Sequence, residues 1–371
     1  MDAAATSSTA HSFDVAIVGG GPIGLAAAIE ARLAGLSVVL IEQRTGAIDK
    51  ACGEGLMPGA VPLLHRLGVE VEGLPLRGVT YRSAARGSAG VTHRFAGAGG
   101  LGVRRTTLHM ALALRAEQLG VQRSSGKATE LRQGTAGVQV FVTDRWISAR
   151  YLLGCDGLHS TVASLTGLRA VPVIGHSRIS RLRRRRDRES RRYGVRQHYA
   201  VAPWSDNIEV YWAADAEFYV TPVSPAVVGL AMLSRQGTDF DTALASVPEL
   251  AERIAGAEPA SSRRGAGPFG QVTRARTAGR VLLVGDASGY VDAITGEGLR
   301  LGMAQARVAV QCISAQHPER YEKEWRSQTR DFRLLTSALV VFATSRWRGR
   351  IVPLAVRLPW LFGSVVERLA R

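Results

Sequence analysis

Three glycines near the N-terminus, Gly19, Gly21 and Gly24, have a spacing that suits contact with a pyrophosphate. The first would allow a tight turn, the second leaves the backbone open to the phosphates, and the third would let a helix pack closely on a strand. An apolar run at residues 15–18 precedes them and a helical pattern follows, so the phosphates would meet a helix N-terminus. Glu42 ends the next apolar run and could accept hydrogen bonds from both hydroxyls of an adenosine ribose. The pattern predicts a site for FAD or NAD rather than NADP, with a fortuitous glycine-rich turn as the alternative.

Two further carboxylates indicate which of these dinucleotides the site would bind. Asp156 follows an apolar run that begins at Tyr151, and Asp286 follows a second run that begins at Val281. A carboxylate at the end of a strand can bind the hydroxyls of a polyol chain. FAD carries a ribityl chain and NAD does not, so the interpretation favours FAD.

The chain resembles the FAD-dependent oxidoreductases of the aromatic-hydroxylase and geranylgeranyl-reductase superfamily, which are similar to class A flavoprotein monooxygenases. The resemblance lies in Gly19–Gly24 with Glu42, in Gly154–Thr161 and in Gly285–Gly298, which occur in family order. It implies that Asp286, with Gly285 before it, binds the ribityl chain.

The resemblance also implies two further cofactor contacts. Gly296 and Gly298 would begin a helix that points at the flavin pyrimidine ring, where a helix N-terminus stabilises the negative charge of the reduced flavin. Arg105 would clamp an FAD phosphate or ribose, with Arg104 as a close competitor and a solvated arginine as the alternative.

The activity that the resemblance implies is an NAD(P)H-dependent monooxygenase that hydroxylates or epoxidises an apolar small molecule through a flavin C4a-hydroperoxide. An alkene reductase acting on a prenyl chain is the alternative, and a flavin-folded protein without turnover is an alternative of another class. The segment Glu217–Pro222 departs from the aromatic motif of prenyl reductases, which favours the monooxygenase. The segment Gly296–Gly298 favours the reductase. Ala163 stands where the family usually has an arginine, so that position offers no cation for an NAD(P)H phosphate.

Few side chains are candidates for catalysis, because a flavin carries its own chemistry. Cys52 lies in a segment that resembles a loop near the flavin of prenyl reductases, and Glu54 and Glu297 are candidate acids near the ring. A buried structural role for the cysteine and solvated roles for the acids are equally open.

Candidate residues of the substrate pocket come from alternating segments between residues 196 and 222, and ordinary sheet packing is the alternative for each of them. They are His198, Tyr211, Tyr219 and Pro222, with Trp212 beside them.

The order of the strands and helices expected around these residues predicts an α/β fold. A Rossmann-like FAD-binding domain would comprise residues 13–170 and 271–330, with an antiparallel substrate sheet inserted at 171–270 and joined by part of 75–100. A helical C-terminal tail would follow at 331–371.

The composition and charge of the chain limit the classes of partner that we expect. The 371 residues carry a net charge of +16, but 44 of the 47 basic residues are arginine, as a GC-rich coding sequence would produce. Half of the excess lies in Arg178–Arg196, which holds ten arginines and two acids and predicts a solvated, mobile loop. No basic stripe with interleaved aromatics occurs elsewhere, so nucleic acid is not an expected partner.

The expected localisation rests on two features that the sequence lacks, a disulfide framework and a secretory signal. Three widely spaced cysteines give neither a disulfide framework nor a metal site, so no metal is expected, and the first twelve residues do not resemble a secretory signal. We therefore expect a cytoplasmic protein, with no predicted oligomeric state. The basic, tryptophan-bearing tail suggests peripheral contact with an anionic membrane, with packing over the substrate sheet as the alternative.

Overall fold

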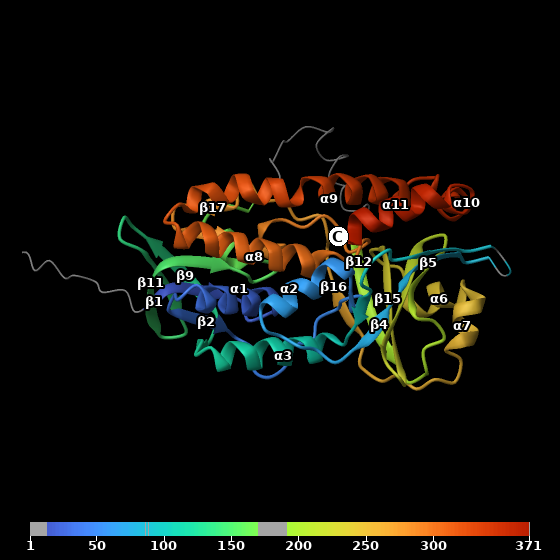
Figure 1. Ribbon diagram of the computed structural model, residues 1–371, viewed down its shortest axis with the longest axis horizontal. Helices are drawn as coiled ribbons and strands as arrows, with labels where there is room; N and C mark the ends of the chain where they lie inside the picture. Colours follow the sequence, from blue (N-terminus) through green and yellow to red (C-terminus); the bar gives the residue numbers. More distant parts are fainter. Residues whose placement is uncertain (1–12, 86, 88, 170–190, 371) are drawn as a thin grey trace, which may run out of the picture.

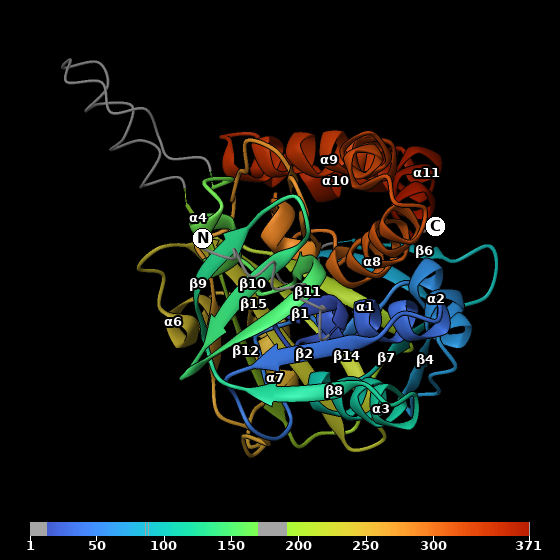
Figure 2. The same ribbon diagram turned by 90° about the vertical axis from the view of Figure 1, so that its left-hand side faces the viewer.

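The computed structural model describes residues 13–85, 87, 89–169 and 191–370. Two large sheets lie one after the other along the long axis of the molecule, and helices from the C-terminal third form a layer along one side of both (Figure 1). The same layer lies at the top in the perpendicular view, with helix α3 on the opposite side of the molecule (Figure 2).

The first sheet has a parallel centre, in which the neighbouring strands follow the order β18-β11-β1-β2-β8. A hairpin of β9 and β10 pairs with β11 in antiparallel fashion, and β17 adds an antiparallel edge. Its strands are β1 (Phe13–Val18), β2 (Val38–Glu42), β8 (Gln122–Ser125), β9 (Ala128–Gln133), β10 (Val138–Val142), β11 (Arg145–Gly154), β17 (Thr277–Ala278) and β18 (Val281–Leu283).

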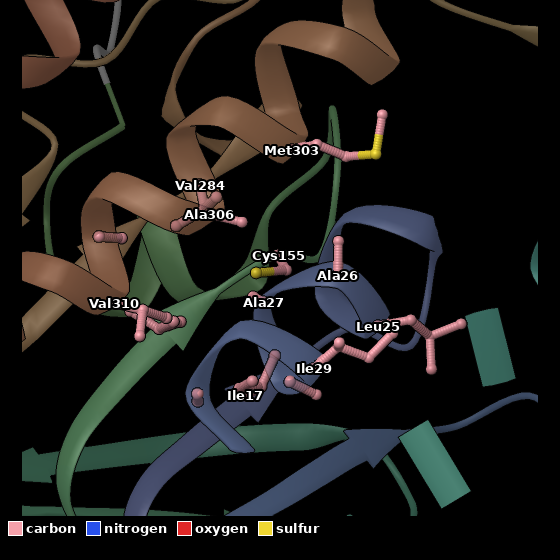
Figure 3. Close-up of a cluster of buried hydrophobic side chains, with 14 of the residues drawn as sticks. Ile17, Leu25, Ala26, Ala27, Ile29, Cys155, Val284, Met303, Ala306 and Val310 are labelled. Carbon is pink, nitrogen blue, oxygen red and sulfur yellow. The ribbon is translucent and has the colours of Figure 1, made fainter. Parts of the chain in front are cut away.

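Alternating side chains of β1 enter two apolar layers, because successive residues of a strand face opposite sides of a sheet. Val15 and Ile17 pack against helices α1, α3 and α8, whereas Ala16 and Val18 pack against the β9–β10 hairpin and helix α4. Small residues of α1 face α8 in the first layer, where Ala306 and Val310 approach them closely (Figure 3). The parallel strand order and this packing place the start of α1 at the carboxyl ends of the parallel strands.

The helices differ in length and role. They are α1 (Pro22–Leu33), α2 (Val61–Arg66), α3 (Arg105–Gln118), α4 (Thr161–Leu165), α6 (Phe240–Ala245), α7 (Pro248–Arg253), α8 (Gly298–Ser314), α9 (Tyr321–Thr344), α10 (Ile351–Arg357) and α11 (Pro359–Ala370). Short 3-10 turns occur at η1 (Pro58–Ala60), η2 (Gly285–Ser288), η3 (Pro318–Arg320) and η4 (Arg348–Arg350).

The second sheet has seven strands in the order β16-β12-β15-β14-β13-β5-β6. All of its pairings are antiparallel except that of β13 with β5. Its strands are β5 (Gly78–Ser83), β6 (Val91–Arg94), β12 (Arg192–Tyr199), β13 (Asn207–Trp212), β14 (Ala216–Ser224), β15 (Val227–Arg235) and β16 (Arg264–Ala266). A small third sheet joins β3 (Gly55–Leu56), β7 (Gly100–Gly102) and β4 (Leu74–Leu76).

Both faces of the second sheet are covered. Phe218 and Val220 belong to a core that includes Phe240 of α6, whereas Ile208 and Val210 belong to a core that includes residues of α9, α10 and α11. The α/β fold class, with its mixed second sheet and helical C-terminal region, is confirmed.

The C-terminal helices begin before the expected boundary, because α9 runs without a break through residue 331. No single helix in the described parts of the chain has both the length and the apolar character to cross a bilayer. One bent pair, Arg348–Arg357 with Pro359–Ala370, satisfies those two criteria together at an angle of 107°.

Candidate functional site

The glycine segment forms a tight loop between β1 and α1. Gly19 has a φ of 105°, and a Cβ atom there would lie 2.6 Å from the carbonyl oxygen of Cys155. A Cβ on Gly24 would lie 1.8 Å from the carbonyl oxygen of Gly19, whereas a Cβ on Gly21 would meet nothing within 4 Å. The first and third glycines are therefore required by the fold itself, and the second leaves open space at the N-terminus of α1, which begins at Pro22.

Glu42 lies beside this loop at the end of β2. One carboxylate oxygen accepts a hydrogen bond from the backbone N–H of Gly20 at 2.7 Å, and the other accepts from that of Arg44 at 2.9 Å. Each carboxylate oxygen can accept a second bond. The side chain therefore stays in position at the cavity wall with free acceptor capacity for two hydroxyls.

His109 of α3 supports the glycine loop and is not among the residues predicted from the sequence. Its Nε2 donates a 2.9 Å hydrogen bond to the carbonyl oxygen of Gly20, and its Nδ1 is buried with no hydrogen-bond partner among the described residues. Burial lowers the pKa of His109 and so favours the neutral form of the ring. Its place one helical turn after Arg105 was the available signal, because both side chains then share a face of α3.

Asp156 and Asp286 both reach the cavity that extends from Glu42. One oxygen of Asp156 accepts hydrogen bonds from the backbone N–H groups of Thr161 and Val162, at 2.6 and 3.1 Å, and so caps α4. Its other oxygen is buried and accepts no hydrogen bond from any residue that the structure describes, and burial raises the pKa of this carboxyl group. Asp286 instead faces Lys50, whose Nζ lies 3.5 Å from a carboxylate oxygen. Asp156 thus has a structural role as well as a place at the cavity wall.

Arg105 lies where two cavities meet. It begins α3, and its backbone N–H donates a 2.8 Å hydrogen bond to Glu54. Its side chain lines both cavities, and its Nε is buried and has no hydrogen-bond partner in the described parts of the chain. Nε of Arg104 is likewise buried and unpaired. A guanidinium with unused donors beside an open helix N-terminus is suited to an anion.

Glu54 is part of a buried polar network. Its side chain is 2% exposed and its φ is 58°, a conformation that costs a non-glycine residue about 1 kcal/mol or more. The second carboxylate oxygen lies 2.5 Å from Nε2 of His198, and Nδ1 of His198 lies 3.0 Å from Nη1 of Arg196. Because an arginine can only donate, Nδ1 accepts, and Nε2 carries the proton that His198 donates to Glu54. The network continues from Arg196 to Asp49 and from His198 to Ser261.

The start of α8 forms another part of the cavity wall. Gly296 and Gly298 line the second, mainly apolar, of the two cavities that meet at Arg105, but the intervening Glu297 does not. Its fully buried side chain turns away to pair with Arg300, and burial raises the pKa of Glu297 to about 7. Of the three candidate catalytic residues, Cys52 and Glu54 therefore lie at the cavity and Glu297 lies behind it.

The second cavity is mainly apolar and encloses about 200 Å³, whereas the cavity along the glycine loop encloses about 360 Å³. The two share Ile23, Lys50, Arg105, Leu158, Ala266 and Asp286 and therefore adjoin one another. Met57, Val79, Ile208, Val210, Leu233 and Phe269 are among the apolar walls of the second cavity.

The candidate pocket residues divide according to the face of the strand on which each of them lies. Tyr219 lines the apolar cavity and donates its hydroxyl to the carbonyl of Ile294 at 2.9 Å. Tyr211 does not line it, because Ile208 and Val210 of the same strand face the cavity and Tyr211 faces the opposite core. Pro222 and His198 also lie outside the lining, and His198 reaches the cavity only through Glu54.

The arginine-rich segment requires a correction. Residues 170–190 of the expected mobile loop lie outside the described residues, but Arg192 and Arg196 belong to β12 and are buried. Arg192 binds both carboxylate oxygens of Glu217, at 3.2 and 2.8 Å, and donates to Asp292 at 2.9 Å. The prediction of a solvated loop is wrong for these two arginines, because carboxylates distant in sequence neutralise them.

A second cation completes this cluster. Arg348, from the turn between α9 and α10, donates to the same Glu217 at 2.6 Å. Asp292 accepts from the backbone N–H of Ile294 at 3.0 Å, next to Gly296 at the cavity wall. The cluster of Arg192, Glu217, Asp292 and Arg348, here called the buried charge cluster, therefore joins the second sheet, the loop before α8 and the C-terminal helices.

The described residues fit FAD on the evidence of their unused groups. The open space at Gly21, the free acceptor capacity of Glu42 and the unpaired Nε of Arg105 suit the two phosphates and the ribose. Asp286 lines both the loop cavity and the apolar cavity, and its carboxylate could accept hydrogen bonds from a polyol chain.

Comparisons with known proteins agree with this geometry. The sequence model of the FAD binding domain family matches residues 12–216, more than half of the chain. Rifampicin monooxygenase of Streptomyces venezuelae is 29% identical over 326 residues, which are 79% of this chain and 62% of that protein. Digeranylgeranylglycerophospholipid reductase of Methanococcus vannielii is 23% identical over 347 residues, 86% of this chain and 81% of that protein.

A solved structure shows the same fold. The flavin-dependent brominase Bmp2 superimposes with a TM-score of 0.78 at 19% identity, covering 96% of this chain and 93% of the brominase. This likeness concerns the fold alone. The chain spans about three fifths of the length of the rifampicin monooxygenase it matches. Because the family model covers most of the first sheet and the cavity walls carry the groups that FAD requires, the chain belongs to the FAD binding domain family and FAD is its cofactor.

Proposed function

We propose that the chain is an FAD-dependent oxidoreductase that acts on an apolar small molecule held between the second sheet and the C-terminal helices. The observation that carries this proposal is that the two cavities adjoin one another, with Arg105 and Asp286 lining both. A dinucleotide that binds along the glycine loop can extend past these residues to the apolar cavity, where a substrate would meet its reactive end.

The bound FAD would supply the redox chemistry, and the residues of this chain would hold it and its substrate. Gly21, the N-terminus of α1 and Arg105 would bind the pyrophosphate, and Glu42 would bind the ribose. Asp286 would bind the ribityl chain. The N-terminus of α8 at Gly298 would stabilise negative charge on the flavin ring, because its free N–H groups and dipole favour an anion.

Monooxygenation with NAD(P)H as the electron donor is the reaction that we favour. Its support is the similarity to rifampicin monooxygenase and the apolar character of the cavity, which excludes the water that would divert an oxygen-transfer reaction. Incubating the FAD-loaded protein with NAD(P)H, labelled oxygen gas and polycyclic aromatic compounds tests it. Mass spectrometry should find one labelled oxygen atom in the product, and NAD(P)H consumption without a labelled product from any compound would contradict the proposal.

Alkene reduction is the second candidate, and the Glu54 network favours it. Saturating a carbon–carbon double bond consumes a hydride and a proton. The hydrogen-bonded chain from Ser261 through His198 to Glu54 could deliver that proton, since Ser261 is partly exposed and Glu54 lines the apolar cavity. The similarity to a digeranylgeranylglycerophospholipid reductase also supports it.

A reaction in heavy water without oxygen separates the two candidates. Reduction would add two hydrogens to a polyprenyl substrate, at least one of them deuterium, and His198→Asn would slow that step because it breaks the hydrogen-bonded chain. Product formation that requires oxygen would exclude reduction.

A further inference from the structure

The C-terminal helices expose an unusual amount of apolar surface. Among the described residues, thirteen large apolar side chains are exposed, and eight of them lie between positions 334 and 361. Trp360, Val341 and Leu334 are 69%, 68% and 65% exposed. The eight are Leu334, Val341, Trp347, Leu354, Val356, Leu358, Trp360 and Leu361, here called the tail patch. Single exposed apolar residues are ordinary, but a gathering of this kind marks an interaction surface.

The tail patch is densest at the bend between α10 and α11. Every residue of 353–361 except Ala355 is exposed, although seven of those nine positions are leucine, valine, tryptophan or proline. The two helices meet there at a bend of 107°. Both views of the molecule place these helices in the outer layer (Figures 1 and 2).

The charge around the tail patch has one sign. Residues 332–366 contain five arginines and no aspartate or glutamate. Arg348 points inward to Glu217, whereas Arg346, Arg350 and Arg357 are exposed and form no ion pair with any described residue. The guanidinium groups of Arg346 and Arg350 lie 5.3 and 4.7 Å from the ring centre of Trp347. An amphipathic tryptophan flanked by free cations is typical of a side chain at a lipid headgroup layer.

The opposite face of the same helices borders the apolar cavity. Leu339 of α9 and both Val366 and Leu369 of α11 line its wall. Arg348 holds the layer to the second sheet, and Glu367 accepts hydrogen bonds from His93 and from the backbone of Ala96. The tail patch is therefore carried by a fixed layer one helix thick.

We propose that the tail patch docks on an anionic lipid bilayer, with the 353–361 bend inserted among the headgroups and the three free arginines bound to acidic lipids. A second copy of the chain is the less favourable occupant, because a twofold contact would bring these arginines against the same cations of the partner without an intervening carboxylate. The docking does not depend on which reaction the protein performs.

Flotation of the full-length, FAD-loaded protein with vesicles tests this proposal, since bound protein rises with lipid and aggregates sink. The protein should float with phosphatidylcholine vesicles that contain phosphatidylglycerol, and the floating fraction should fall as salt is raised. The triple substitution R346Q/R350Q/R357Q should weaken binding about a hundredfold, at about fivefold for each arginine. Trp360→Ser with Leu361→Ser should weaken it roughly tenfold or more.

A matched control uses exposed apolar residues on the far side of the molecule. Met110 and Leu114 on α3 are 55% and 58% exposed, and replacing both by serine should leave flotation unchanged. Flavin absorbance and melting temperature establish that each variant is folded. Wild-type protein that stays unbound with anionic vesicles, or a Trp360→Ser/Leu361→Ser variant that floats like the wild type, would overturn the proposal. So would a wild-type dimer that this variant converts to a monomer, because a second copy would then cover the tail patch.

Discussion

Replacing Glu217 by glutamine should destabilise the protein strongly, because this carboxylate lies at the centre of the buried charge cluster. Glu217 is fully buried and accepts three hydrogen bonds, two from Arg192 and one from Arg348. With Asp292 the cluster holds two cations and two carboxylates, whose formal charges cancel. The substitution leaves one positive charge uncompensated and turns an amide NH₂ toward guanidinium donors.

Removing one partner of a buried ion pair costs about 3–5 kcal/mol. The cluster is nearly inaccessible, with side chains of Arg192, Asp292 and Arg348 that are 4%, 2% and 13% exposed, so solvent screens little of this loss. A loss of that size is a large share of the roughly 5–15 kcal/mol that stabilises a typical domain. Since 1 kcal/mol shifts the melting temperature of a domain of 150–250 residues by about 2–4 °C, we expect a decrease of roughly 10 °C.

Urea unfolding of the FAD-free protein measures the free energy, and FAD retention on gel filtration supplies a second readout. Retention should also fall, because Asp292 accepts a hydrogen bond from the backbone of Ile294 in the loop that leads to Gly296. Glu130→Gln is the matched control, since Glu130 is 59% exposed and lies 3.9 Å from Arg132. An unfolding free energy for Glu217→Gln within about 1 kcal/mol of the wild type would refute the reasoning, because the cluster would then make no net contribution.

Three further perturbations test the site. Gly24→Ala should prevent correct folding of the loop because its Cβ would meet the carbonyl of Gly19, whereas Gly21→Ala should leave the melting temperature of the FAD-free protein unchanged and lower FAD affinity, as fluorescence titration would reveal. Burial raises the pKa of Glu297 from 4.5 to about 7, so the folded state holds a proton that the unfolded chain releases, and stability should fall as the pH rises between these values. Glu297→Gln should remove that decline, on the order of 3 kcal/mol, and an unchanged pH profile in urea titrations would disprove the assignment. His109→Ala removes the donor to the glycine loop and should weaken FAD binding by about 1 kcal/mol, with equal affinity in the same titration as the contrary result.

The cofactor half of the molecule was predictable because its signals are local. The turn at Gly19 and the close packing at Gly24 follow from the absence of a side chain, and the end of β2 at Glu42 follows from an apolar run. Each of these features depends on a few neighbouring residues.

The substrate half was harder to predict because its arrangement depends on distant partners. Local charge counting placed Arg192 and Arg196 in a solvated loop, and nothing near them in sequence indicated that Glu217, Asp292 and Asp49 would neutralise them. The sequence also did not indicate which of the candidate pocket residues face the cavity, and the reason is a different one. The face of a strand that lines a cavity is fixed by register with neighbouring strands, so composition alone did not distinguish Tyr219 from Tyr211.

The contribution of Val366 and Leu369 to the cavity wall has a consequence for the order of assembly during synthesis. All of the strands in the first sheet and the start of α8 emerge from the ribosome before α11 does. A nascent chain can therefore complete its FAD site while the apolar cavity is still open on one side. Until α11 docks, such an intermediate would expose its flavin edge to water and oxygen, and a chain cut before residue 359 should oxidise NAD(P)H wastefully to release hydrogen peroxide.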